Sequence, residues 1–229
     1  MPLPGRPAQF LEVYLEDPYR VSVDAGAVSR APEAVVVGVA SRQSTRLLVG
    51  GVIHTFHIAF QPAGFHRLFG LNMSGVADAG APVRDLGLPA VEALVDVIRR
   101  APDFETRVRH CEAWLRLRLA SAPPEDATAR LARAIRRGAV NASVANLAAR
   151  SRLSPRQLQR RFREQVGVTP RLYARTVRFE ALINARMASP AASWTELAHR
   201  FGYFDQAHLS RDAHDFMGAA PGEWDLTLV

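Results

Sequence analysis

Apolar runs in the first half of the chain predict a small β unit. Residues 35–39 form an almost continuous apolar run typical of a buried strand, and two similar runs, 46–49 and 52–60, flank Gly50-Gly51. A Gly-Gly dipeptide between two strand-like runs favours a tight hairpin. We therefore expect β structure over about residues 10–62, with the second and third runs paired as a hairpin.

The spacing of apolar residues becomes helical between residues 88 and 119. Two sets recur at intervals of three and four residues: Val91, Leu94, Val95 and Ile98 in the first, and Val108, Cys111, Leu115 and Leu119 in the second. We expect these helices over about residues 87–121. The stretch Ser-Ala-Pro-Pro-Glu-Asp at 121–126 is typical of a linker. We therefore place a first, α+β domain at residues 1–122 and a second domain at 127–229.

Signals for helix starts and stops run through the second domain. Ser154 and Thr169 each precede a proline, which suits the first helical position, and Ser193 with Glu196 fits a capping box. Asp205 can cap a further helix. Glycines stand where helices should end, at positions 167, 202 and 218. The second domain is therefore predicted to be all α-helical.

Two helix-turn-helix patterns lie in tandem in this domain, over residues 147–167 and 197–218. In each, a short apolar helix precedes a sharp turn and a second helix whose polar side chains can face outward. The expected apolar cores are Val144, Leu147, Ala148, Leu153, Leu158 and Phe162 in the first unit, and Trp194, Leu197, Ala198, Phe201, Leu209 and Phe216 in the second. Such a unit places its second helix in the major groove of DNA. Two units joined by a long helix predict two adjacent groove entries.

The charge distribution favours contact with nucleic acid in the second domain. All 29 basic residues are arginines; residues 1–126 hold thirteen of them against fourteen acids, whereas residues 127–229 hold sixteen against eight. Nine arginines lie between residues 150 and 178, where Glu164 is the single acid. A solvated helix face would mix both signs. Because arginine matches both phosphate and the guanine edge, this stretch predicts DNA binding.

The helix expected after Ser154 carries a polar face suited to DNA. Arg156, Arg160 and Arg163 share one side because they lie four and three residues apart. Arginine pairs with guanine through two hydrogen bonds, and glutamine pairs with adenine in the same way. The alternative interpretation of this face is a helix coated with polar residues for solubility.

The second of these helices is less basic. Its candidates for contacts with bases or phosphates are Gln206, His208, Ser210 and Arg211. Three acids in the same helix oppose phosphate. Asp205 is explained as a helix cap, and Asp212 is expected to pair with an arginine of the linking helix, whereas the pattern gives no role to Asp215.

These residues together resemble the DNA-binding domain of the AraC/XylS family of bacterial transcription regulators. The similarity is carried by Leu147-Ala148, the stretch 154–162, the stretch 167–170, Tyr173, Arg178-Phe179, Ala181, Leu197-Ala198, Gly202-Tyr203, the stretch 205–209, Arg211, Gly218 and Pro221. The resemblance implies two helix-turn-helix units bridged by a long helix. It also implies that both recognition helices enter successive major grooves on one face of the DNA.

By motif position, the resemblance implies roles for individual side chains. Contacts with bases are assigned to Arg156, Gln159 and Arg160 in the first unit and to Gln206, His208 and Arg211 in the second. Contacts with the DNA backbone are assigned to Ser154, Gln157, Arg161, Arg163, Arg171 and Ser210.

The chain departs from the family pattern in its second unit. Ala213 stands where the family usually has an aromatic, and His214-Asp215 stands where basic residues often follow. Trp224 replaces the usual tyrosine near the end. These departures imply a second unit that is packed less tightly or binds DNA more weakly.

The first domain resembles, less specifically, the short sensor domain attached to some members of this family. The similar part is the stretch 60–70, followed by Asp85-Leu86. It implies a shortened cupin-like β unit followed by helices, and no particular ligand. His54 and His57 lack the His-x-His spacing and the following glutamate of a metal-binding cupin, and on a strand they point to opposite faces.

Signatures of an enzyme are missing from the sequence. It has no P-loop, no glycine-rich dinucleotide fingerprint and no nucleophile with a base, so we expect no enzymatic activity, cofactor or metal. The single cysteine, Cys111, lies on an apolar helix face and is expected to fill the core. The absence of a long apolar run and of a signal pattern favours a cytoplasmic protein.

The sequence therefore predicts a sequence-specific, DNA-binding transcription regulator. Its fold is expected to be an α+β first domain followed by an all-α tandem helix-turn-helix domain. Double-stranded DNA is the expected partner, and a small-molecule effector, a second copy of the chain and RNA polymerase are further candidates. Two alternatives stay open: a small-molecule-binding protein whose DNA-binding domain has weakened, and an enzyme in the first domain.

Overall fold

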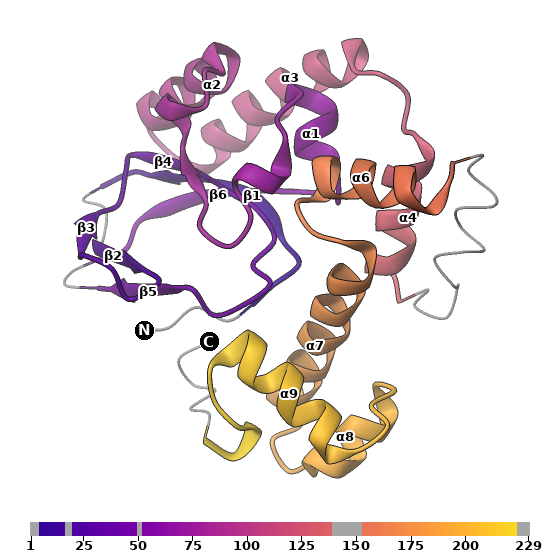
Figure 1. Cartoon of the computed structure of the whole chain (residues 1–229). Helices are drawn as coiled ribbons and strands as arrows, with labels where there is room; N and C mark the ends of the chain where they lie inside the picture. The colour runs from indigo at the N-terminus through magenta and orange to yellow at the C-terminus, as the bar shows by residue number, and fades with distance from the viewer. Residues whose placement is uncertain (1–4, 17–19, 50–51, 139–152, 224–229) are drawn as a thin grey trace.

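The computed structural model describes residues 5–16, 20–49, 52–138 and 153–223 (Figure 1). Its N-terminal part contains two antiparallel sheets. The first has the strand order β6-β1-β4-β7, formed by β1 (Gln9–Tyr14), β4 (Ala34–Val37), β6 (Thr55–Phe60) and β7 (Ala81–Pro82). The second has the order β3-β2-β5, formed by β2 (Arg20–Val23), β3 (Ser29–Arg30) and β5 (Thr45–Leu48).

The predicted hairpin around Gly50-Gly51 is wrong. β5 pairs with β2, whereas β6 pairs with β1, where Ile58 faces Leu11. The physical reason is β1, whose six residues are all buried and which lies between β4 and β6. Buried backbone N–H and C=O groups must find partners on both edges of a strand, so β6 completes β1 instead of pairing with β5. Gly50-Gly51 lie outside the described residues.

Helices cover one face of the first sheet (Figure 1). The helices and 3-10 turns that follow β6 in the N-terminal part are α1 (Gly64–Phe69), η1 (Met73–Gly75), η2 (Val83–Asp85), α2 (Pro89–Arg100) and α3 (Phe104–Ser121). The predicted apolar face of α2 is confirmed, because all four of its members are buried. In α3, Cys111 is buried in the core as predicted, and burial raises the pKa of its thiol to about 11. Leu119 is half exposed, so the predicted face of α3 is covered only in part.

The C-terminal part is helical, as predicted. It consists of α4 (Ala127–Arg136), α6 (Pro155–Val166), α7 (Pro170–Ala188), α8 (Trp194–Arg200), α9 (Gln206–Met217) and η3 (Pro221–Glu223). The predicted caps are confirmed, since each capping side chain accepts from the backbone N–H three residues later: Ser154, Thr169, Ser193 and Asp205. Val144, Leu147 and Ala148, expected in the first helix of the first unit, lie outside the described residues, as does Trp224.

The described residues form three hydrophobic clusters. One lies between the first sheet and α2 and α3. The second joins Val39 and Ala63 of the N-terminal part to α4, α6 and α7, where Phe162 and Tyr173 are completely buried. The third belongs to the second helix-turn-helix unit and contains Ala213, which is also completely buried. The first unit therefore shares a core with the N-terminal part, whereas the second unit has its own.

The described ranges contain neither a candidate membrane span nor a cluster of metal-binding side chains. No described helix is both long and apolar enough to cross a membrane. Among the same residues, no three or more His, Cys, Asp or Glu side chains gather as ligands. His54 lies 3.1 Å from a carboxylate oxygen of Glu16, and His57 lies 3.2 Å from one of Glu12. These histidines therefore have carboxylate partners on neighbouring strand segments.

Candidate nucleic-acid interface

α6 buries one side and exposes the other along its whole length. Leu158, Phe162 and Val166 are completely buried in the cluster shared with α4 and α7. The exposed side chains are Arg156, Gln157, Gln159, Arg160, Arg161, Arg163 and Glu164. Arg156, Arg160 and Arg163 make no ion pair or hydrogen bond with the part of the chain that the structure describes. Their guanidinium groups are therefore available to an anionic ligand.

Three of the predicted backbone contacts lie in first turns of helices. Ser154 Oγ accepts from the backbone N–H of Gln157 at 3.2 Å, and Gln157 Oε1 accepts from the backbone N–H of Ser154 at 2.9 Å. This reciprocal pair fixes the first turn of α6. Both side chains remain exposed, as does Arg171 at the start of α7. All three stay accessible to a phosphate.

α9 shows the same division into a buried and an exposed side. Leu209, Ala213 and Phe216 pack into the core of the second unit. Gln206 and Arg211 are exposed, and Ser210 is half-buried. The outer side of α9 therefore offers fewer positive charges than the outer side of α6.

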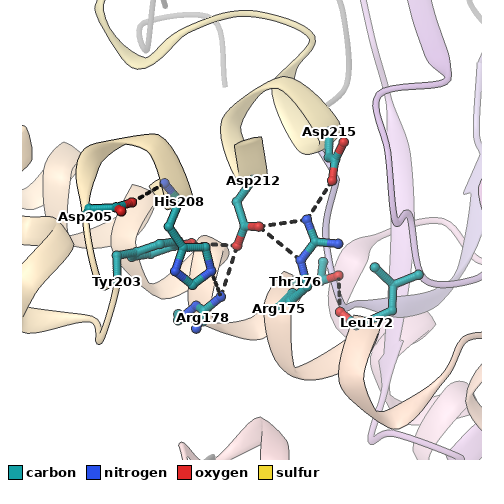
Figure 2. Close-up of polar contacts among 9 residues, drawn as sticks. All are labelled: Leu172, Arg175, Thr176, Arg178, Tyr203, Asp205, His208, Asp212 and Asp215. Carbon is teal, nitrogen blue, oxygen red and sulfur yellow. Dashed lines mark hydrogen bonds and ion pairs between the residues drawn. The ribbon is translucent and has the colours of Figure 1, made fainter. Parts of the chain in front are cut away.

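His208 is turned toward α7 (Figure 2). Nη2 of Arg178 donates to Nε2 of His208 at 3.2 Å, and the imidazole meets the ring of Tyr203 edge-on, with centroids 5.0 Å apart. The structure thus leaves Gln206 and Arg211 exposed, but places His208 against the linking helix.

Asp212 lies at the centre of a polar network between α9 and α7 (Figure 2). Its side chain is almost completely buried. Arg175 donates to Oδ1 from Nε at 3.0 Å and from Nη2 at 2.7 Å. Arg178 Nη2 and the hydroxyl of Tyr203 donate to Oδ2 at 3.2 and 3.1 Å. The predicted pairing of Asp212 with an arginine of the linking helix is confirmed.

The same network explains Asp215, for which the sequence offered no role. Nη2 of Arg175 donates to Oδ2 of Asp215 at 2.6 Å. Burial alone would lower the pKa of Arg175, but the hydrogen bonds with Asp215 and Asp212 outweigh it and raise this pKa. Burial, followed by the charge of Asp212, raises the pKa of Tyr203 above its ordinary range. Asp212 and Asp215 therefore neutralise cations of α7.

The N-terminal part contacts both helix-turn-helix units. Nε2 of Gln9 donates to the carbonyl of Val166, at the end of α6, at 3.0 Å. Backbone N–H groups of Gly5 and Gln43 donate to carbonyls in the last turn of α9. These contacts tie the end of each exposed helix to the β unit.

Comparison with known proteins identifies the C-terminal region. Residues 147–226 match the model of a helix-turn-helix domain family. This chain carries an AraC-type helix-turn-helix domain. The match confirms the predicted DNA-binding domain of a transcription regulator.

Two further comparisons cover the chain as a whole. Comparison with curated proteins gave no match. Among solved structures, the chain resembles an apo ToxT variant from Vibrio cholerae strain SCE256. The two chains share 12% sequence identity over 97% of this chain and 90% of that chain, with a TM-score of 0.48.

Two features in and beside the AraC-type domain were not predicted from the sequence. One arginine of the linking helix was expected to pair with Asp212, whereas both Arg175 and Arg178 converge on it; their three-residue spacing on α7 could have been recognised. Asn72 and Ser74, at η1 of the N-terminal part, line a groove of about 800 Å³ together with the exposed side of α6. No local signal in the sequence places η1 there.

Proposed function

We propose that this protein is a sequence-specific DNA-binding transcription regulator in which α6 is the principal reading helix. The observation that carries the proposal is the exposed row of Arg156, Arg160 and Arg163, which have no described partner, on the second helix of a helix-turn-helix unit. In the major groove, Arg156, Gln159 and Arg160 contact base edges. Arg161 and Arg163 contact phosphates, which supply most of the salt-dependent affinity.

α9 acts as a second reading helix with a smaller contribution. Gln206 and Arg211 contact bases, and Ser210 contacts the backbone. His208 acts indirectly, because its imidazole accepts from Arg178 and packs on Tyr203. Its side chain thereby holds α9 at a fixed orientation on α7.

Selection of bound sequences from random duplex DNA, at two salt concentrations, tests this function. Two enriched blocks about one helical turn apart would show that both helices read bases. One block would restrict base reading to α6. Absence of salt-sensitive binding would instead favour a small-molecule-binding protein with a weakened DNA-binding domain.

A cavity in the N-terminal part supports the further proposal of a small-molecule effector. The cavity lies among strands of both sheets and has a volume of about 400 Å³, within the range of small-ligand sites. Its lining combines apolar Val21, Val35 and Leu47 with polar Arg6, Glu12 and Arg42. Arg6 and Arg42 directly neighbour the two residues whose N–H groups donate to α9. A ligand in the cavity can therefore influence the position of the second unit through these two residues.

A cavity-filling variant tests the effector proposal. Val37 lines the cavity, so Val37→Trp should abolish ligand-induced thermal stabilisation while DNA binding without ligand persists. Val97→Trp, at an exposed position of α2, is the matched control and should keep the ligand response. A ligand response that survives Val37→Trp would place the effector elsewhere. A second copy of the chain and RNA polymerase stay predictions as partners.

A further inference from the structure

η1 stands beside the exposed side of α6. The groove between them has a volume of about 800 Å³, and every residue that lines it has a polar or charged side chain. Asn72 and Ser74 form one wall, and the other consists of Arg156, Gln157, Gln159, Arg160, Arg163 and Glu164 of α6. A part of the N-terminal region therefore borders the face that we propose for reading DNA.

η1 is firmly attached at this position. Met73 is completely buried in the core of the N-terminal part, so η1 cannot move away without opening that core. Gly167, at the end of α6, has a φ of 103°, and a Cβ built there would lie 2.9 Å from the carbonyl oxygen of Met73. The buried hydrogen bond from Gln9 to Val166 fixes the same junction. The groove is therefore a preformed surface.

Asn72 lines this surface, and the acceptor oxygen of its side-chain amide is already used. Its Oδ1 accepts from the backbone N–H of Ser74 at 3.1 Å and from the hydroxyl of Ser74 at 2.8 Å. These two bonds orient the amide and leave Nδ2 with no partner among the described residues. An oriented amide N–H is a common ligand of DNA phosphates.

The charge of the groove selects its occupant. Arg156, Arg160 and Arg163 contribute three cations without described partners, against the single carboxylate of Glu164. A helix in the major groove is flanked on both sides by sugar-phosphate backbones, about 12 Å apart. An element that stands beside such a helix therefore faces one of those backbones.

We propose that η1 is a DNA-contacting element of the N-terminal part, in which Nδ2 of Asn72 donates to a phosphate flanking the α6 site. The inference rests on the proposed function, since it requires α6 to enter the major groove. With this contact, the N-terminal part contributes directly to the affinity for DNA. If η1 instead obstructed α6, its variants would have the opposite effects on DNA affinity.

Charge variants of Ser74 in the full chain distinguish these roles. Ser74→Arg should bind the selected duplex about three- to tenfold more tightly, with a salt dependence steeper by about one unit, and Ser74→Glu should bind more weakly by a similar factor. Ala93→Arg and Ala93→Glu, at an exposed position of α2, add the same charges away from the groove and should change affinity less than twofold. Asn72→Ala should weaken binding about fivefold.

Neutral phosphate substitution locates the contact. Duplexes are prepared that carry a methylphosphonate at one backbone position at a time. The affinity of each duplex is then measured for wild-type protein and for Asn72→Ala. At the contacted phosphate, the substitution should weaken wild-type binding but leave the variant's affinity unchanged. Thermal melting of each variant checks that the fold is intact.

The outcomes separate this inference from the proposed function. If wild-type protein shows no salt-sensitive DNA binding, the proposed function itself fails. If wild-type protein binds DNA but the Ser74 variants behave like the Ala93 variants, η1 makes no contact and the inference is overturned. Tighter binding by Ser74→Glu or Asn72→Ala would also overturn it, in favour of obstruction.

Discussion

The two helix-turn-helix units use their arginines differently. On α6, Arg156, Arg160 and Arg163 point into solvent with no described partner. In the second unit, Arg175 and Arg178 of α7 point inward and are held by Asp212. A count of charges over residues 127–229 therefore overstates the surface charge of the second unit. The contrast teaches that net charge locates a DNA-binding region but not the helix that dominates binding.

The units also differ in how they join the N-terminal part. The first unit shares a hydrophobic cluster with it, including Val39 and Ala63. The second unit has its own cluster and receives backbone hydrogen bonds from Gly5 and Gln43. Burial of apolar surface contributes more to an attachment than a few hydrogen bonds do. We therefore expect the position of the second unit to respond more readily to changes in the N-terminal part.

Removal of Asp212 should have the largest effect on the unfolding free energy, because it would break the internal charge pairing of the second unit. Asp212→Ala leaves Arg175, Arg178 and the hydroxyl of Tyr203 without their shared acceptor. Loss of one partner from a buried ion pair costs about 3–5 kcal/mol. Urea unfolding followed by circular dichroism measures this loss of unfolding free energy.

Asp215→Ala is the matched control for that experiment. The side chain of Asp215 is 54% exposed, and among the described residues it pairs with Arg175 alone. Exposed ion pairs contribute about 0–1 kcal/mol, so this variant should stay close to wild type. Equal losses in the two variants would mean that burial of Asp212 does not dominate the network.

A glycine pair tests how closely the first unit joins the N-terminal part, with Gly202, which has open space around it, as the control. Gly167 and Gly202 both have left-handed backbone conformations, with φ of 103° and 74°. Alanine at either position pays a conformational cost of about 1 kcal/mol, but only at Gly167 would the new Cβ collide with Met73. We expect Gly167→Ala to lose about 3 kcal/mol of unfolding free energy and Gly202→Ala about 1 kcal/mol. Similar losses would contradict a tight junction between α6 and η1.

Base reading by the two helices is compared by removing one arginine from each. Arg160→Ala should cost about 1–3 kcal/mol of binding free energy and relax specificity at one base pair. Arg211→Ala should cost less, since we propose a smaller contribution from α9. Titration of the selected duplex and of its single-base variants measures both quantities. An equal loss on specific and random DNA would reassign Arg160 to a phosphate contact.

The sequence was most informative where structure depends on neighbouring residues. The caps at Ser154, Thr169, Ser193 and Asp205 follow from side chains that bond to backbone three residues away, and all were predicted. The buried face of α2 follows from its periodicity in the same way. Local rules therefore sufficed for these helix starts, for the buried face of α2 and for the basic face of α6.

Features that depend on distant residues were missed or mispredicted. The hairpin failed because β1 pairs with β6 across more than forty residues, and no local signal ranks that partner above β5. The position of η1 beside α6 requires the packing of the N-terminal part on the first unit. The role of Asp215 depends on how α7 and α9 lie relative to each other, because its partner Arg175 is on the other helix.

Two buried tyrosines provide the subtlest test of the contrast between the units. The hydroxyl of Tyr203 donates to Asp212, whereas the hydroxyl of Tyr173, in the cluster of the first unit, has no partner within the described ranges. Removal of a satisfied buried hydroxyl costs about 1 kcal/mol, but removal of an unsatisfied one is neutral or stabilising. Tyr203→Phe should therefore lower the unfolding free energy by about 1 kcal/mol, and Tyr173→Phe should not lower it.

In addition to the thiol of Cys111, these two tyrosines make stability decrease at alkaline pH. Burial raises the pKa of both above the ordinary value of about 10. Each folded-state tyrosine thus holds its proton more tightly than the unfolded chain does. The associated stability is complete below pH 10 and decreases as the pH rises above it. Unfolding free energies measured from pH 8 to pH 11 should decline in wild type and less steeply in either phenylalanine variant. An unchanged slope in Tyr203→Phe would mean that its hydroxyl is more accessible to water than its place beside Asp212 implies.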